Sequence, residues 1–349
     1  MPLSLEEANI SRYLKGEYRS HDETPNAKFQ DIRGRIICNS QIMLSVLEKL
    51  PRIAESESTI LIHGDSGTGK ELIAQTIHLL SPRSEKPFIA INCALLSENF
   101  LATELFGHTK GAFTGAIAQK RGLLEEANGG TFFMDEVGCL SPAIQAKLLR
   151  VLEERAIRRF GETKSSPIDI RLIAATNIDL EQAVERSEFR KDLFYRLKVI
   201  SLRIAPLRQR REDIPLLADH FLKKFNTKLQ RTIRGFSSEV ISILKRYDFP
   251  GNVRELENLV EHAVVMTKNS QIRVEDIPHS ILEFNPRNQS GDSRPTLAQM
   301  EQERIIEEIR LFPRNLDTVA RNLGINRSTL WRKMKKYGIT KERIIMGDG

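Results

Sequence analysis

The sequence is poor in the features that mark secreted and membrane-spanning proteins. Its 349 residues include three cysteines, Cys38, Cys93 and Cys139, which form no C-x-x-C pair. This spacing favours neither a disulfide framework nor a zinc cluster. No apolar run has the length of a membrane helix, and the first residues lack the basic and apolar pattern of a signal peptide. We therefore expect a cytoplasmic protein with no membrane contact.

The charge of the chain is also only modestly unbalanced. Fifty-three Lys and Arg residues against 46 Asp and Glu residues give a net charge of +7. An excess of this size favours anionic partners without identifying them. The length and the 40% share of hydrophobic residues predict a globular protein with two or three domains.

Composition divides the chain into segments. The first 26 residues are polar and too few for a sensing domain, so we expect control by a partner protein, by expression level or by a sensor that this chain lacks. The expected segments are a leading segment and linker at 1–26, an α/β unit at 27–210, a helical unit at 211–285, a Pro, Gly and Ser-rich linker at 286–296 and a terminal unit at 297–349.

Four apolar runs of strand length alternate with helical sequence in the α/β unit. They are STILIHG, PFIAINC, GTFFMDE and RLIAATN, which begin at Ser58, Pro87, Gly130 and Arg171. Continuous apolar strands between helices predict a parallel sheet that is covered by helices on both faces. After Pro206 the pattern changes to helical periodicity, which predicts the helical unit.

Residues 64–70 have the pattern of a phosphate-binding loop between a strand and a helix. Glycines let backbone N–H groups surround phosphate oxygens, Lys70 supplies a positive charge, and the helix N-terminus adds its dipole. Glu71 occupies the position where generic phosphate loops carry Ser or Thr for magnesium, so that ligand must come from elsewhere or be water. The expected nucleotide-binding residues are Gly64, Asp65, Ser66, Gly67, Thr68, Gly69, Lys70 and Glu71.

Polar residues follow two of the predicted strands. Asp135 at the end of a strand can hold magnesium, and Glu136 can orient or deprotonate the attacking water. A solvated acidic pair is the simpler interpretation of this dipeptide alone, but the phosphate loop favours catalysis. Thr176 and Asn177 give a weaker signal for sensing the γ-phosphate or positioning the water. We therefore expect ATP and Mg²⁺ as cofactors.

Three arginines are candidates for contacts to the nucleotide. Arg190 and Arg196 are six residues apart, so they do not share one helix face closely. Surface arginines are usually only solvated, yet arginine also stabilises charge in phosphoryl transfer. Arg254 begins a helix of the helical unit, where it is placed to close on a nucleotide between the two units.

The terminal unit has the spacing of a helix-turn-helix. Ala320, Gly324 and Leu330 match the crossing, the turn and the apolar anchor, and the second helix starts at about Arg327 and is basic. Without this spacing, a basic solvated helix would be the better interpretation. The expected DNA-binding residues are Asn326, Arg327, Ser328, Thr329, Arg332, Lys333 and Lys336.

The helix that precedes the helix-turn-helix is predicted to be amphipathic. Its apolar residues are Leu297, Met300, Ile305, Ile309 and Leu311. Such a stripe can form a dimer face as well as pack on the DNA-reading helices.

Six motifs resemble the central AAA+ domain of bacterial sigma-54-dependent transcription activators, the NtrC-type enhancer-binding proteins. In order, and within residues 27–283, they are GDSGTGKE, GHTKGAFTGA, GGTFFMDE, RLIAATN, FRKDLFYRL and FPGNVREL. Glu71 is usual in that family. The resemblance implies an α/β fold with an AAA+ P-loop parallel sheet and an α-helical lid, followed by a small all-α Fis-type helix-turn-helix domain.

The resemblance also implies roles for single residues. Asn92 matches a switch residue that restrains Glu136, and Arg254 matches the second sensor. Arg190 and Arg196 match arginines that reach the neighbouring subunit's nucleotide, which implies a ring, typically of six. When the protein is not in the active ring, a dimer is expected. The segment 158–170 matches a second mobile loop.

The hexapeptide GAFTGA matches the family's projecting loop that touches sigma-54. Small residues permit the loop to change shape and the aromatic ring supplies contact area, whereas an isolated loop of this composition would be a hairpin tip. Its residues are Gly111, Ala112, Phe113, Thr114, Gly115 and Ala116, with Phe113 and Thr114 as the expected contacts.

The first hypothesis is an ATP-hydrolysing activator that binds upstream double-stranded DNA through residues 297–345 and remodels the sigma-54 RNA polymerase holoenzyme from the closed to the open promoter complex. A repressor with nucleotide as a structural ligand predicts a degraded Asp135–Glu136 pair or GAFTGA segment, and both are intact. A general AAA+ unfoldase or clamp loader lacks the terminal reader and the 111–116 loop.

Overall fold

The computed structural model describes residues 36–112, 118–282, 301, 304–306, 308–309, 315–337 and 339. The chain divides into two compact units between Phe284 and Asn285.

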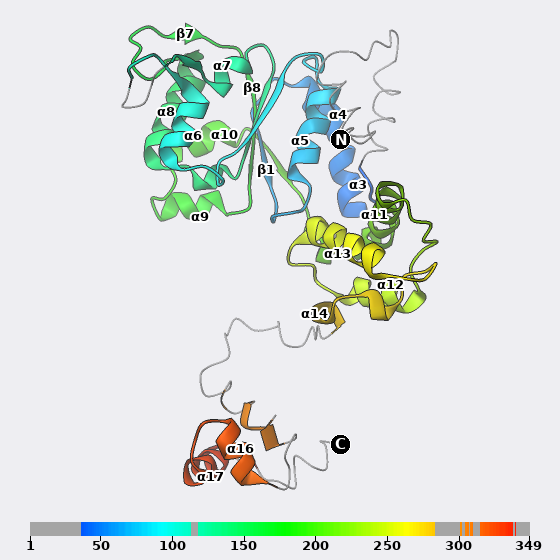
Figure 1. The fold of residues 1–349 in the computed structure, drawn as a ribbon. Helices are drawn as coiled ribbons and strands as arrows, with labels where there is room; N and C mark the ends of the chain where they lie inside the picture. Colours follow the sequence, from blue (N-terminus) through cyan, green and yellow to red (C-terminus); the bar gives the residue numbers. More distant parts are fainter. Residues whose placement is uncertain are drawn as a thin grey trace. The chain divides into compact units, whose positions relative to one another are not determined.

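The first unit contains a five-stranded parallel sheet in the order β2-β5-β8-β1-β9 (Figure 1). Its strands are β1 (Ile60–His63), β2 (Phe88–Asn92), β5 (Thr131–Asp135), β8 (Arg171–Thr176) and β9 (Ile200–Arg203). Four of them confirm the predicted apolar runs. The edge strand β9 was not predicted, because its residues alternate between covered and exposed positions and form no continuous apolar run.

Helices cover both faces of the sheet (Figure 1). One face carries α3 (Gln41–Leu47), α4 (Leu50–Glu55) and α5 (Lys70–Leu80), and the other carries α6 (Glu98–Phe106), α7 (Leu123–Glu126), α8 (Pro142–Glu154), α9 (Leu180–Glu185) and α10 (Lys191–Leu197). Because side chains alternate along a strand, each strand contributes to two cores. In β5, Phe132 and Met134 pack in one core and Phe133 packs in the other. The predicted α/β fold is confirmed.

Two short antiparallel pairs extend from the main sheet. Strands β3 (Gly107–His108) and β4 (Lys120–Arg121) pair on either side of residues 109–119, and we call this β3–β4 unit with its connection the arm. Strands β6 (Ala156–Ile157) and β7 (Ser166–Pro167) form the second pair.

A helical subdomain follows β9, as the periodicity predicts. It contains α11 (Ile214–Leu229), α12 (Ser238–Arg246), α13 (Asn252–Met266) and α14 (His279–Leu282), with 3-10 helices η2 (Leu207–Gln209), η3 (Arg211–Asp213) and η4 (Val274–Asp276). A separate core, which includes Phe221, Leu244 and Val260, holds these helices together.

The second unit contains α16 (Leu316–Asn322) and α17 (Arg327–Lys336). The side chain of Asn326 caps α17 by accepting a hydrogen bond from the Thr329 N–H at 2.9 Å. Gly324 adopts a φ of +66° between the two helices, which favours glycine at the predicted turn. Ile305 and Ile309 of the preceding helix are buried, as predicted, whereas Leu297, Met300 and Leu311 lie outside the described residues.

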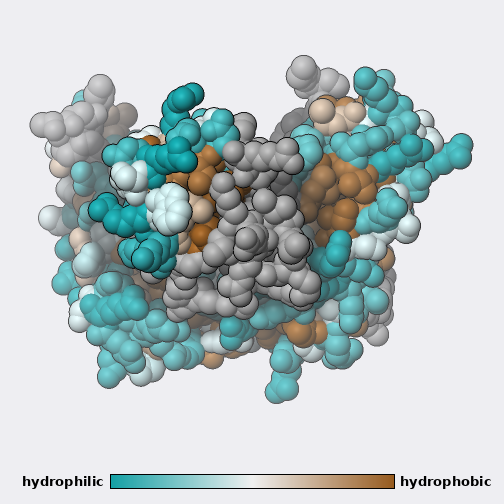
Figure 2. Space-filling view, turned by 90° about the horizontal axis from the view of Figure 1, so that it is seen from below, coloured by the Kyte–Doolittle hydropathy of each residue, from teal (hydrophilic) through white to brown (hydrophobic). Residues whose placement is uncertain are grey.

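Among the coloured residues of the face shown in Figure 2, hydrophilic residues surround two hydrophobic areas. Within the described ranges, every helix is too short or too polar to cross a membrane.

Candidate functional site

The phosphate-binding loop connects β1 to α5 at the carboxyl edge of the sheet. Gly67 has a φ of +75°, and a Cβ there would lie 2.3 Å from the Gly251 carbonyl oxygen. Gly69, with a φ of +99°, precedes the first residue of α5, and a Cβ there would meet no atom within 4 Å. A left-handed backbone that opens above a helix N-terminus suits the binding of phosphate oxygens. The predicted loop therefore has a shape that fits a nucleotide.

Lys70 and Glu136 meet beneath this loop. The buried Lys70 Nζ lies 3.2 Å from Glu136 Oε1 and donates to the Gly64 carbonyl at 3.0 Å. The other Glu136 oxygen accepts a hydrogen bond from the Asn177 N–H at 3.1 Å. Glu136 has a φ of +55°, which costs about 1–2 kcal/mol for a residue other than glycine. The structure thus brings Lys70, Glu136 and Asn177 together from three elements.

Asp135 lies beside Glu136 and contacts Asn92. Burial raises the pKa of the Asp135 carboxyl, and the charge of Lys70 opposes this shift. The Asn92 amide donates to Asp135 Oδ2 at 3.3 Å, because Asn92 and Asp135 are paired in the register of β2 and β5. Asn92 therefore contacts Asp135 rather than Glu136, the residue that it was predicted to restrain. The Thr176 hydroxyl accepts from the Ile178 N–H at 3.2 Å and supports the turn after β8.

Asn252 joins the helical subdomain to the phosphate loop, a role that the sequence interpretation missed. Its buried side chain donates to the Ser66 carbonyl at 2.9 Å and accepts from the Leu207 N–H at 2.8 Å. Arg254, two residues later, has its Nη1 3.5 Å from the Ser66 hydroxyl of the phosphate loop. The FPGNVREL motif contained the signal, since Asn252 lies within it.

Two further arginines of the same subdomain also contact the loop. Arg208 pairs with Asp65 at 3.1 Å, and the buried Arg210 donates to the Thr68 carbonyl at 2.9 Å. Burial lowers the pKa of Arg210, and Asp213 opposes this shift. No sequence pattern indicated a role for either residue.

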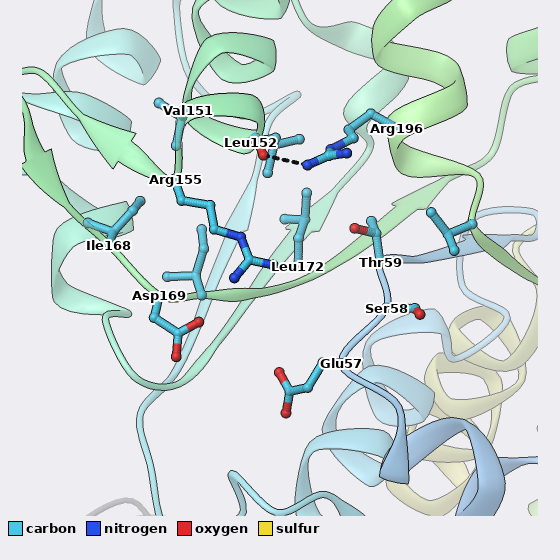
Figure 3. A pocket seen from close by; sticks show the side chains of 12 residues that line it. Glu57, Ser58, Thr59, Val151, Leu152, Arg155, Ile168, Asp169, Leu172 and Arg196 are labelled. Atoms are coloured by element: carbon cyan, nitrogen blue, oxygen red, sulfur yellow. Dashed lines mark hydrogen bonds between the residues drawn. The ribbon is translucent and has the colours of Figure 1, made fainter.

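Arg190 and Arg196 contact other groups of the same chain. Arg190 pairs with Asp192 at 2.7 Å, and Arg196 donates to the Leu152 carbonyl at 2.9 Å. Figure 3 shows Arg196 and Arg155 at a pocket that also includes Thr59, which precedes β1. The phosphate loop follows the other end of β1, which is about 13 Å long for four residues. The structure therefore places Arg196 toward the opposite end of β1 from Lys70 of the same chain.

The base of the arm contacts the segment 158–170. The Phe160 N–H donates to the Gly107 carbonyl at 3.0 Å, and the Thr109 N–H donates to the Phe160 carbonyl at 3.0 Å. Of the predicted sigma-54 contacts, Gly111 and Ala112 lie on the described arm. The other four, Phe113, Thr114, Gly115 and Ala116, lie outside the described residues.

Helix α17 buries Leu330 and Met334 and exposes its opposite side. The exposed residues of the helix are Arg327, Ser328, Trp331, Arg332, Lys335 and Lys336. Lys333 instead forms an ion pair with Glu301, which also accepts from the Tyr337 hydroxyl at 2.7 Å. Trp331 is the only tryptophan of the chain and is 61% exposed, although the sequence interpretation did not select it.

Three family models match the chain in succession. A sigma-54 interaction domain matches residues 36–203, an AAA+ ATPase lid domain matches residues 208–294, and a bacterial regulatory protein domain of the Fis family matches residues 296–337. The first two cover the parallel sheet and the helical subdomain, and the third covers α16 and α17.

Relatives match across nearly the whole chain. It is 44% identical to the transcriptional regulatory protein ZraR of Escherichia coli K12 over 95% of this chain and 74% of that protein. The regulatory protein AtoC of the same organism is 42% identical over 97% of this chain and 76% of its own length. The crystal structure of NtrX from Brucella abortus in complex with ATP has a TM-score of 0.69 and 30% identity, and covers 96% of this chain and 74% of that chain. The chain belongs to the sigma-54-dependent transcriptional regulators, DNA-binding proteins with a central AAA+ ATPase domain.

Proposed function

We propose that this chain binds upstream double-stranded DNA and uses ATP hydrolysis to convert sigma-54 RNA polymerase from the closed to the open promoter complex. The observation that carries the proposal is the position of Glu136, which lies between Lys70 and the Asn177 amide below a loop shaped for phosphate. A repressor that holds nucleotide only as a structural ligand needs no such carboxylate.

Glu136 acts in this proposal as the base that orients and deprotonates the attacking water, while Lys70 and the amides of residues 64–69 bind the phosphates. Asp135 is the candidate magnesium ligand, since a carboxylate oxygen suits this ion, and bound magnesium would neutralise phosphate charge. Asn92 holds Asp135 in place, and Thr176 and Asn177 position the water and the γ-phosphate. Because Glu71 has no hydroxyl, the Thr68 hydroxyl or water completes the set of oxygen ligands.

Arg190 and Arg196 act on the nucleotide of a neighbouring subunit. The position of Arg196 beside Thr59, at the opposite end of β1 from the phosphate loop, supports this assignment, because Arg196 is then directed away from the phosphates that its own loop binds. Each nucleotide then lies between two protomers, with Arg254 of the helical subdomain on the same side as Lys70. An active ring, typically of six, follows from this arrangement, with a dimer as the resting form.

The arm changes position as ATP is hydrolysed and contacts sigma-54 through residues 111–116, with Phe113 and Thr114 as the contacts. Double-stranded DNA is bound by α17, whose exposed basic side suits a major groove. The proposed DNA contacts are Asn326, Arg327, Ser328, Thr329, Arg332, Lys333 and Lys336. The proposed boundaries are 27–210 for the α/β ATPase subdomain, 211–285 for the lid, 286–296 for the linker and 297–349 for the DNA-binding domain.

In-vitro transcription from a sigma-54 promoter tests the proposal. We expect the Thr114→Ala protein to keep ATPase activity and lose open-complex formation, since it retains the nucleotide site. The Glu136→Gln protein is expected to bind ATP and fail to hydrolyse it, because an amide cannot act as a base. Equal transcription by both variants and the wild type would overturn the proposal.

A further inference from the structure

A lysine from α8 lies between two aromatic rings at the base of the arm. Lys147 Nζ is 3.3 Å from the ring centroid of Phe160 and 4.4 Å from that of Phe106. The two rings meet edge to face with centroids 6.3 Å apart. An ammonium group over aromatic faces is attracted by their negative electrostatic potential, most strongly where water is excluded. Phe106 is fully buried, so this contact fixes Phe160 against the body of the subunit.

Phe160 in turn holds the arm through its backbone. It hydrogen-bonds to Gly107 and Thr109 on either side of His108 and so extends the β3–β4 pair by one bridge. The next residue, Gly161, packs so closely that a Cβ there would lie 2.5 Å from the Thr109 hydroxyl. A displacement of Phe160 must therefore displace the base of the arm.

Near its N-terminus, the same helix also contacts the segment that follows β5 and the backbone of Arg190. Helix α8 begins six residues after Glu136, and the fully buried Gln145 donates to the Leu140 carbonyl at 2.8 Å. Gln145 also accepts a hydrogen bond from the Arg190 N–H at 2.8 Å. Gln145 and Lys147 are thus two residues apart on one helix. Gln145 contacts the start of α10, and Lys147 contacts Phe160, which in turn holds the base of the arm.

We propose that Lys147 is a positioning residue that couples α8 to the arm, so that movement of α8 during the ATPase cycle displaces Phe160 and the arm base together. The inference rests on the proposed function, in which the arm acts on sigma-54. In this proposal Lys147 contacts neither nucleotide nor polymerase. Its role is to make the position of the arm depend on the position of α8. Without the cation, the contact between α8 and the Phe160 ring loses its electrostatic attraction.

The test compares Lys147→Met, which keeps the length of the side chain and removes its charge, with Lys147→Arg, which keeps a cation. Lys164→Met is the matched control. Lys164 is an exposed lysine of the segment 158–170, which also contains Phe160. For each full-length protein we would measure the ATPase rate, the mass of the assembled ring and the number of open complexes formed per ATP hydrolysed.

We expect Lys147→Met to assemble normally and to keep an ATPase rate within about twofold of the wild type. The yield of open complexes per ATP should fall about tenfold, because a desolvated cation–π contact is lost. Lys147→Arg should restore most of the yield, and Lys164→Met should match the wild type. An unchanged yield in Lys147→Met, or an equal loss of ATPase activity and open complexes, would overturn the inference.

Hydrogen exchange without polymerase separates this inference from the proposed function. We expect the Thr109 and Phe160 amides to exchange faster in Lys147→Met than in Lys147→Arg, whatever the arm contacts. Unchanged exchange would overturn the inference and leave the proposed function intact. Wild-type protein that hydrolyses ATP and forms no open complexes would overturn the proposed function instead.

Discussion

Asn252, the first residue of α13, donates a hydrogen bond to the Ser66 carbonyl across the junction between the helical subdomain and the phosphate loop. The same side chain accepts from the Leu207 N–H. One buried amide therefore contacts both the phosphate loop and the start of the helical subdomain, and it adds to the Arg208 and Arg210 contacts that hold the subdomain against the loop.

Replacing this amide should weaken both folding and nucleotide binding. Asn252→Ala leaves the Ser66 carbonyl and the Leu207 N–H without their partner, at a cost of about 1–3 kcal/mol for each buried group. We expect a lower melting temperature and a reduced stabilisation by ATP, both measured by thermal unfolding. Asn269→Ala, at an exposed asparagine of the same subdomain, is the control and should behave as the wild type. Equal melting curves for both variants would show that the Asn252 contacts are dispensable.

Mixing two inactive variants tests whether Arg196 acts across subunits. Lys70→Ala lacks its own phosphate contact and Arg196→Ala lacks the arginine offered to a neighbour, so each pure protein should be inactive as an ATPase. In a mixed ring, a Lys70→Ala protomer still carries Arg196. It can offer this arginine to the intact phosphate loop of a neighbouring Arg196→Ala protomer. We expect partial ATPase activity to return on mixing. If the mixture stays as inactive as its components, Arg196 serves the nucleotide of its own chain.

The coupling between ATP hydrolysis and the arm should depend on pH. Burial lowers the pKa of Lys147 to about 8, and the nearby Arg158 charge acts in the same direction. The ammonium form, which makes the cation–π contact, is therefore present below that pH and is lost as the pH rises through it. We expect the yield of open complexes per ATP to fall over this range in the wild type. Lys147→Arg is the control and should give a flat profile, because arginine stays charged.

Trp331 provides a direct signal for DNA binding. It is the only tryptophan and is exposed on the same helix as Arg332 and Lys335, so its emission should change when α17 enters a DNA groove. We expect this change on titration with the target duplex and its reversal by salt, which weakens phosphate contacts. Constant emission while labelled DNA binds would place α17 away from the groove.

Neighbouring basic residues on α17 should differ in their effect on affinity. Arg332 is exposed, whereas Lys333 is held by Glu301 on the preceding helix. Arg332→Ala is expected to weaken DNA affinity about tenfold, which lies within the range of about 1–3 kcal/mol typical of specific contacts. Lys333→Ala is expected to weaken the affinity less. Fluorescence anisotropy of a labelled duplex measures both. A larger loss in Lys333→Ala would mean that its ion pair opens on DNA.

Much of the secondary structure of this protein could be predicted from local sequence patterns. The strands β1, β2, β5 and β8, the glycines of the phosphate loop and the turn at Gly324 all depend on residues close together in the chain. Parallel strands place their carboxyl ends at one edge, so the meeting of Lys70 with Glu136 was also predictable. The edge strand β9 was not, because its pairing with β1 rather than its composition defines it.

The sequence by itself determined the α/β core, the phosphate site and the helix-turn-helix, since each has a periodicity or motif that follows from backbone geometry. Only the tertiary structure decided that Asn252 holds the phosphate loop, that Asn92 contacts Asp135, that Arg196 lies beyond the opposite end of β1 and that Lys147 meets Phe160. These contacts join residues brought together by packing of whole elements, and no local pattern fixes the orientation of one packed element against another.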